Sequence, residues 1–179
     1  MSQPEPQTGT VQGQDQITIE ASVDRVWELI ADSKMLEQWG PVVDRVDVRL
    51  NAGETREDIG SRRHVYITVG KRSDRIIERR TEHNPNRRLA YRIEEDPFLG
   101  SYLKDSGFTM ELDPVGHSQT LFTFTFYQRP RGIRGWLMNP LVRIMQSRGR
   151  RAGLASLKRL AEQADLSRRS TPPEPKISL

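Results

Sequence analysis

The first patterned stretch of the chain is an apolar–polar alternation followed by a helical spacing. Ile17, Ile19 and Ala21 alternate with polar residues, as in a half-buried strand. Apolar residues then recur at i, i+3, i+4 and i+7, which predicts one face of a helix: Val23, Val26, Trp27 and Ile30. Ser22 precedes this helix as a suitable N-cap. A second short helix is expected over residues 34–39, ending at Gly40-Pro41.

Strand patterns dominate the middle of the chain. Residues 45–50 alternate, and residues 60–84 form two strands joined at Gly70-Lys71, where glycine suits the first central position of a type II′ turn. This turn places Arg63 directly opposite Glu78 on the largely apolar face that carries Val65. The sequence therefore predicts two charged side chains pointing inward.

The next strand, over residues 87–94, follows a turn at residues 83–86. With the simplest antiparallel register, Tyr91 faces Glu78, so Arg63, Glu78 and Tyr91 form a polar row across three strands. We expect this row to be either an internal ion pair that fixes the sheet or part of a binding site, because isolated buried charges are costly.

The last hairpin is the most apolar part of the chain. Its two strands turn within residues 114–118 and carry six large side chains on one face: Phe108, Met110, Leu112, Phe122, Phe124 and Phe126. Such a face needs a cover, and only the helix that starts near Arg134 is long enough. Its apolar residues fall into two clusters on different sides, one around Leu141 and one around Leu157, with Gly149 and Gly153 between them.

The length of 179 residues is consistent with one domain. Residues 1–14 and 167–179 have no apolar periodicity and are predicted to be disordered tails, which leaves a single domain over residues 15–166. The absence of cysteine excludes disulfides and thiolate chemistry. No signal peptide or membrane-spanning run is recognisable, so we expect a cytoplasmic protein.

The charge is unevenly distributed. The net charge is +4, yet residues 129–169 hold eleven Lys and Arg against two acidic residues, which gives +9 there and −5 elsewhere. A basic helix of this kind is either a solvated face or a contact for nucleic acid, an anionic membrane or an acidic partner. The run lacks interleaved aromatic residues and known nucleic-acid motifs, so we expect no nucleic-acid partner. Oligomeric state is not predicted.

Four segments in this order resemble the polyketide cyclase/dehydrase and lipid transport type of the START-like (SRPBCC) superfamily. They are ITIEASVDRVWELIADSKMLEQWGPVV (17–43), ERRTEHNPNRRLAYRI (78–93), QTLFTFTFYQRPRG (119–132) and LASLKRLAEQA (154–164), together with Gly60 and Arg63. The resemblance implies an α+β helix-grip fold: a curved antiparallel sheet of about seven strands wrapped around a long C-terminal helix, with two short helices after the first strand. It also implies a cavity between sheet and helix.

The resemblance and the polar row lead to three functional hypotheses. The first is binding of a hydrophobic small molecule (lipid, polyketide or aromatic) without a cofactor or metal. The second is a cyclase or dehydratase in which Glu78 acts as general acid/base, Arg63 holds a ligand oxygen and Tyr91 donates to an enolate. The third is a lipid or quinone carrier that docks on membranes. The expected lining, besides Arg63, Glu78 and Tyr91, is Trp39, Val65, Phe108, Met110, Phe122, Phe124, Trp136 and Leu141.

Overall fold

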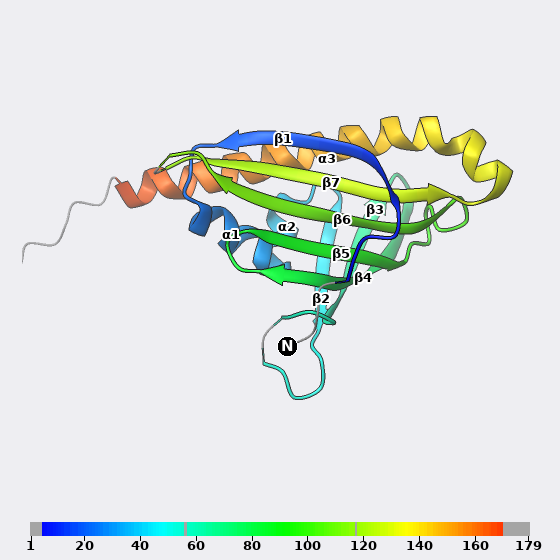
Figure 1. The fold of residues 1–179 in the computed structure, drawn as a ribbon, viewed down its shortest axis with the longest axis horizontal. Helices are drawn as coiled ribbons and strands as arrows, with labels where there is room; N and C mark the ends of the chain where they lie inside the picture. The colour runs from blue at the N-terminus through cyan, green and yellow to red at the C-terminus, as the bar shows by residue number, and fades with distance from the viewer. Residues whose placement is uncertain (1–4, 56, 117, 170–179) are drawn as a thin grey trace, which may run out of the picture.

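The computed structural model describes residues 5–55, 57–116 and 118–169. In this part of the chain, seven strands form one antiparallel sheet in the order β1-β7-β6-β5-β4-β3-β2 (Figure 1). The strands are β1 (Thr10–Ile19), β2 (Val43–Arg49), β3 (Arg62–Val69), β4 (Arg72–Asn84), β5 (Arg88–Glu95), β6 (Leu103–Pro114) and β7 (Thr120–Pro130). The helices are α1 (Val23–Ala31), the 3₁₀ turn η1 (Ser33–Met35), α2 (Leu36–Trp39) and α3 (Gly132–Arg169).

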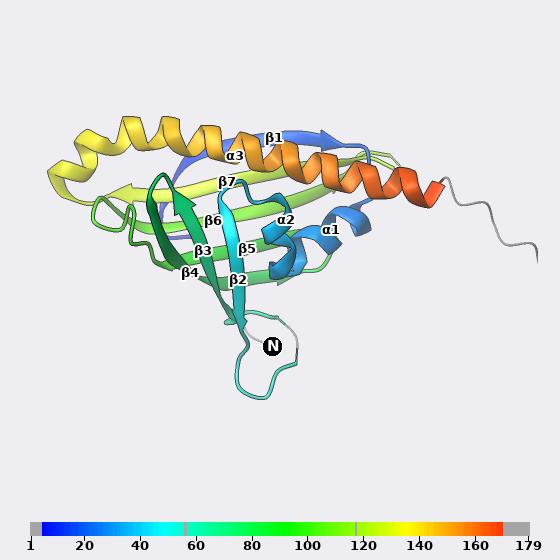
Figure 2. The same cartoon turned by 180° about the vertical axis from the view of Figure 1, so that it is seen from behind.

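The curved sheet and α3 together form the predicted helix-grip architecture. Helix α3 runs along one side of the sheet, and α1 and α2 lie beside its second half (Figure 2). Ser22 caps α1 by accepting a hydrogen bond from the backbone N–H of Arg25, as its position in the sequence predicts. Gly70 adopts a φ of 65° in the β3–β4 turn, a backbone conformation that glycine adopts without strain.

The main core lies between the sheet and the second half of α3. Leu89, Met110 and Phe122 on the sheet pack with Leu157 and Ala161 on α3, and all five are essentially inaccessible to solvent. Complete burial of each large side chain contributes about 1.5–3 kcal/mol, so this contact anchors the helix to the sheet.

The outer edge of β1 lies against α3 rather than against another strand. The Lys158 ammonium donates to the carbonyl oxygen of Thr18 at 2.7 Å, and the Glu162 carboxylate accepts from the backbone N–H of Glu20 at 2.8 Å. Nearer the start of β1, Asp15 pairs with Arg150 at 2.7 Å. Side chains of the helix therefore satisfy backbone groups that an edge strand leaves unpaired.

The N-terminal boundary differs from the sequence prediction. Strand β1 begins at Thr10, inside the segment predicted to be a disordered tail. Ahead of it, Glu5 donates its backbone N–H to Thr81 at 3.1 Å and pairs with Arg79 at 2.7 Å. The early part of β1 lacks an apolar alternation because it is an exposed edge strand. At the other end, α3 continues to Arg169, while residues 1–4 and 170–179 lie outside the described residues.

The register of β5 on β4 also differs from the prediction. Arg63 lies opposite Glu78 as expected, but the partner of Glu78 on β5 is Ile93, and Tyr91 lies opposite Arg80. The turn differs from the expected one, because Asn84 already pairs with Arg88, and an extra residue on β4 between Arg80 and Glu82 shifts the pairing by one. A bulge adds a residue to one strand only, so simple antiparallel counting fails beyond it.

Candidate ligand-binding site

An ion pair between Arg63 on β3 and Glu78 on β4 lies inside the fold. Nε of Arg63 donates to Oε2 of Glu78 at 2.6 Å, and the exposed fractions of the two side chains are 3% and 10%. Burial by itself lowers the pKa of the Arg63 guanidinium, but the charge and hydrogen bond of Glu78, together with Tyr91 and Glu57, outweigh this effect, and the pKa lies above its usual value. Arg63 is therefore a permanent buried cation held in place by one carboxylate.

A second buried arginine, Arg80, lies two residues further along β4. Its Nε and Nη2 atoms donate to the Tyr91 hydroxyl oxygen at 3.0 and 2.6 Å. Nη2 also donates to the Glu57 carboxylate and to the carbonyl oxygen of Ala31, both at 2.8 Å. The Glu57 carboxylate in turn accepts hydrogen bonds from the backbone N–H and the hydroxyl of Ser33. These contacts tie the sheet to the segment after α1.

Aromatic rings connect this polar group to the apolar side of the sheet. The Arg63 guanidinium carbon lies 3.9 Å from the centroid of the Tyr91 ring. The Tyr91 ring stacks on Phe108 at 5.4 Å, and Phe108 stacks on Phe124 at 5.2 Å. A ladder of three rings thus crosses β5, β6 and β7, with a cation over its first ring, an arrangement that stabilises both.

A pocket of about 230 Å³ lies where α2, the start of β2 and α3 meet the sheet. Its walls are almost entirely apolar, from Leu36, Trp39, Val65, Ile67, Ile76, Phe108, Phe124 and Leu154. Arg63 and Glu78 reach it from the sheet, and Arg150 reaches it from α3. Gly149 and Gly153 line the helix side and leave the space open because neither has a side chain. An apolar cleft with a few polar groups is the usual form of a small-molecule site.

The structure brings together only part of the predicted lining. Six of the predicted residues line this pocket: Trp39, Arg63, Val65, Glu78, Phe108 and Phe124. Tyr91, Met110 and Phe122 are buried in the core and are not among the pocket-lining residues. The predicted catalytic row is therefore split, because the Tyr91 hydroxyl is bound to Arg80.

The prediction is wrong for two of the lining residues, Trp136 and Leu141. Their exposed fractions are 69% and 60%, and both lie on the outer side of the first half of α3. The helical spacing identifies an apolar face but not what covers it, and this half of the helix buries chiefly Val142 and Gly135.

Sequence reasoning missed Arg80 and Glu57. Arg80 was detectable, since it has the same parity as Ile76 and Glu78 on one strand and therefore shares their inward face. Glu57 gives no comparable signal, because it lies in the loop between β2 and β3, where no periodicity predicts which residues turn inward.

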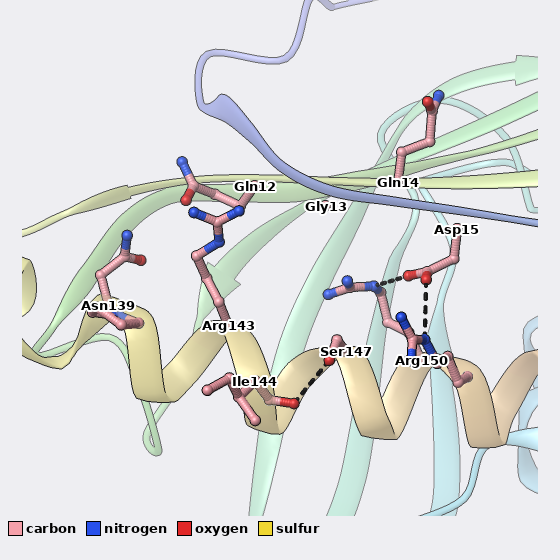
Figure 3. A pocket seen from close by; sticks show the side chains of 11 residues that line it. Gln12, Gly13, Gln14, Asp15, Asn139, Arg143, Ile144, Ser147 and Arg150 are labelled. Atoms are coloured by element: carbon pink, nitrogen blue, oxygen red, sulfur yellow. Dashed lines mark hydrogen bonds and ion pairs between the residues drawn. The ribbon is translucent and has the colours of Figure 1, made fainter.

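A second hollow of about 500 Å³ lies between β1 and the first half of α3 (Figure 3). It is open and largely polar, with Gln12, Asn139, Arg143 and Ser147 among its lining residues, and the Asp15–Arg150 ion pair lies at one end. It lacks the apolar enclosure that holds a small hydrophobic molecule, so the smaller pocket is the better candidate for such a ligand.

Comparison with known proteins defines the class of protein. Residues 10–162 match the family model described as polyketide cyclase/dehydrase and lipid transport, and the chain belongs to this family. Its architecture is that of the START-like superfamily, as the sequence motifs indicated. A comparison with curated protein sequences gives no significant match.

Solved structures share the fold at low sequence identity. The Zhui aromatase/cyclase from a Streptomyces species is 18% identical, with a TM-score of 0.70 over 84% of this chain and 93% of that one. A START superfamily protein from Mycobacterium smegmatis is 13% identical, with a TM-score of 0.69 over 85% and 97%. Norcoclaurine synthase from Thalictrum flavum is 15% identical, with a TM-score of 0.67 over 91% and 98%. At such identities the likeness concerns the fold alone.

Among the described residues, no helix combines the length and the apolar character needed to cross a membrane. In the same part of the chain, no group of three or more acidic or histidine side chains is arranged to hold a metal ion.

Proposed function

We propose that this protein binds a compact, largely apolar small molecule that carries one anionic or carbonyl oxygen, with its apolar body in the pocket and its oxygen on Arg63. The family and the fold support ligand binding or cyclase/dehydrase activity in general. The observation that carries the narrower proposal is an apolar pocket with a buried guanidinium on its wall.

Arg63 retains donors for such a ligand. Its Nε atom binds Glu78, and Nη1 lies 3.5 Å from the Ser33 hydroxyl. In the described part of the chain, Nη2 has no acceptor, although a guanidinium offers five N–H groups in a planar fork. Arg150 also lines the pocket, but its guanidinium pairs with Asp15 on β1, so Arg63 is the cation that the pocket offers to a ligand. An oxygen-bearing end is the complement of this wall.

The same geometry gives less support to a cyclase or dehydratase that uses the predicted row. The Glu78 carboxylate is already engaged by Nε of Arg63 at 2.6 Å, so an internal partner occupies the group that the predicted row assigns to catalysis. Tyr91 binds Arg80 and has no place on the pocket wall. The volume of about 230 Å³ is below the ~300–1,000 Å³ typical of small-molecule pockets and favours a ligand of one or two rings or a short acyl chain.

The test uses two isosteric probes, 2-naphthoate and 2-naphthamide, which share an apolar body and differ in charge. We expect 2-naphthoate to bind about tenfold more tightly, a difference of about 1.4 kcal/mol, as measured by equilibrium dialysis. The double variant Arg63→Met/Glu78→Gln, which leaves no unpaired buried charge, is expected to lose this preference. The matched control is Arg62→Met/Glu94→Gln, which removes an ion pair of the same composition from the exposed face of the sheet.

A second pair of variants tests the location. Gly149→Leu places a side chain over the pocket and is expected to abolish binding of both probes, whereas Gly149→Ala adds one methyl group to open space and is expected to retain it. Equal affinity of the two probes for the unaltered protein, or equal binding by the two Gly149 variants, would contradict the proposal. Native mass spectrometry of protein purified from its source then identifies the natural ligand.

A further inference from the structure

The first half of α3 exposes an unusual concentration of large apolar side chains. Of the twelve exposed large hydrophobic residues in the described part of the chain, seven fall between residues 133 and 145. We call these seven the apolar face: Ile133, Trp136, Leu137, Met138, Leu141, Ile144 and Met145. Trp136 and Ile133 are 69% and 77% exposed. Isolated exposed apolar residues are normal on a protein surface, but a contiguous group of this kind marks an interaction site.

The helix geometry places these residues away from the sheet. At ~100° per residue, Leu137, Leu141, Ile144 and Arg148 lie within about 60° of one another, while the buried Val142 lies well around the helix. The start of α3 lies at one end of the molecule, away from α1 and α2, in both views (Figure 1, Figure 2). The described part of the chain therefore leaves this face uncovered.

The charges beside the apolar face have one sign. Residues 114–161 contain no aspartate or glutamate. In the described part of the chain, Arg134, Arg143 and Arg148 have no carboxylate within ion-pair distance, whereas Arg150 and Arg151 share Asp15. Arg143 extends from α3 across the groove toward Gln12 of β1 (Figure 3). Unpaired arginines are thus distributed around the apolar residues rather than compensated within the fold.

We infer that this half of α3 is a docking surface for an anionic phospholipid bilayer, on which the helix lies in the plane of the interface. An apolar face with a tryptophan, flanked by arginines, fits the boundary between acyl chains and negatively charged headgroups. The apolar side chains enter the acyl boundary, and the three unpaired arginines contact lipid phosphates. This inference does not depend on the pocket or its ligand. A second copy of the chain would bring the same arginines together, and a purely acidic partner would leave the apolar side chains exposed.

The test is sedimentation of the full chain with two kinds of vesicle, one of phosphatidylcholine alone and one containing a quarter phosphatidylglycerol. We expect binding to the anionic vesicles, weakening as salt rises. The triple variant Arg134→Gln/Arg143→Gln/Arg148→Gln is expected to reduce partitioning about a hundredfold. Its control, Arg49→Gln/Lys71→Gln/Arg75→Gln, removes the same charge from exposed positions elsewhere and is expected to bind as the unaltered protein does.

A second set of variants tests the apolar contribution. Trp136→Gln/Leu137→Gln/Leu141→Gln keeps good helix formers and is expected to abolish sedimentation, and circular dichroism checks that the helix remains. Its control changes three exposed apolar residues elsewhere: Val11→Gln/Leu50→Gln/Val115→Gln. Anionic vesicles are expected to shift the tryptophan emission to the blue in the unaltered protein, and Trp136→Phe is expected to bind while losing most of this shift.

Two results would overturn the inference. One is vesicle binding that neither triple variant weakens more than its control does. The other is absence of binding to either kind of vesicle. If sedimentation equilibrium then shows a dimer that the triple apolar variant dissociates, the apolar face contacts a second copy of the chain.

Discussion

The Arg80 guanidinium donates two hydrogen bonds to the hydroxyl oxygen of Tyr91, from atoms 3.0 and 2.6 Å away, and each residue is only 1% exposed. This contact crosses from β4 to β5 next to a bulge at which the strand pairing shifts by one residue. It gives a buried cation a fixed acceptor and holds the first ring of the aromatic ladder in place.

Replacement of Tyr91 by phenylalanine is expected to lower the free energy of unfolding by about 1–3 kcal/mol, because two donors of Arg80 lose their acceptor in a buried site. Urea denaturation followed by circular dichroism measures the change. Tyr127→Phe is the control, since the Tyr127 hydroxyl makes no hydrogen bond with any described residue. Under the proposed function, Tyr91→Phe retains the preference for 2-naphthoate; loss of that preference in a folded variant would place the hydroxyl at the ligand.

Removal of one member of the Arg63–Glu78 pair is expected to cost more than removal of both. Arg63→Met leaves a buried carboxylate without its partner and should lower the free energy of unfolding by about 3–5 kcal/mol. Adding Glu78→Gln should restore a substantial part of this loss, because the remaining group is neutral. A double-mutant cycle from urea denaturation measures the coupling. Additive effects of the two changes would show that the pair does not act as a unit.

Two glycines of α3 should respond to alanine with opposite signs. A Cβ atom at Gly149 meets nothing within 4 Å, so Gly149→Ala is expected to stabilise the protein by about 0.5–1 kcal/mol through helix propensity. A Cβ atom at Gly135 overlaps the carbonyl oxygen of Tyr102, so Gly135→Ala is expected to be destabilising. Thermal denaturation of both variants checks the signs, and stabilisation by Gly135→Ala would contradict the packing of α3 on the β5–β6 connection.

Low pH should weaken the contribution of Glu94 to the free energy of unfolding. Hydrogen bonds from Arg62 at 2.6 Å and Arg79 at 2.8 Å hold the pKa of this carboxyl below its usual value, although partial burial opposes the effect. A lowered pKa in the folded state stabilises the fold above the unfolded pKa of about 4.3, and this stabilisation disappears as pH falls through the folded pKa.

The corresponding measurement compares the unaltered protein with Glu94→Gln from pH 6 down to pH 3. The difference in free energy of unfolding is expected to be at most about 1 kcal/mol at pH 6, because Arg62 is half exposed, and to vanish in acid. A difference that stays constant across this range would exclude an ionised Glu94 as its source.

Most of the fold could be predicted because its signals are local. Three of these signals depend only on neighbouring residues in the chain: Ser22 as a cap, Gly70 in the first central position of a turn, and the inward face shared by Phe122 and Phe124 on one strand. The order of strands and helices then matched a known family. The early part of β1 escaped detection because its burial is shallow and its partners lie more than a hundred residues away.

From the sequence, the site could be predicted only within the β3–β4 hairpin. Arg63 lies opposite Glu78 because the turn has two residues and the hairpin has no bulge, so counting residues back from the turn predicts this pair. The position of Tyr91 depends on where the β4–β5 turn closes and on one extra residue in β4, and no composition signal marks either of them. Trp136 and Leu141 were misplaced because a helical period shows which residues share a face, whereas the tertiary arrangement decides whether that face meets the sheet or the solvent.

The hydrogen bonds that Lys158 and Glu162 of α3 make with the backbone beside β1 have a consequence for self-association. A bare edge strand is a template on which another polypeptide can extend the sheet. Here the helix occupies that position and engages the carbonyl of Thr18 and the amide of Glu20, so an incoming strand would first have to displace a helix anchored by Leu157 and Ala161. The helix therefore prevents strands of other chains from adding to this edge of the sheet and forming fibres.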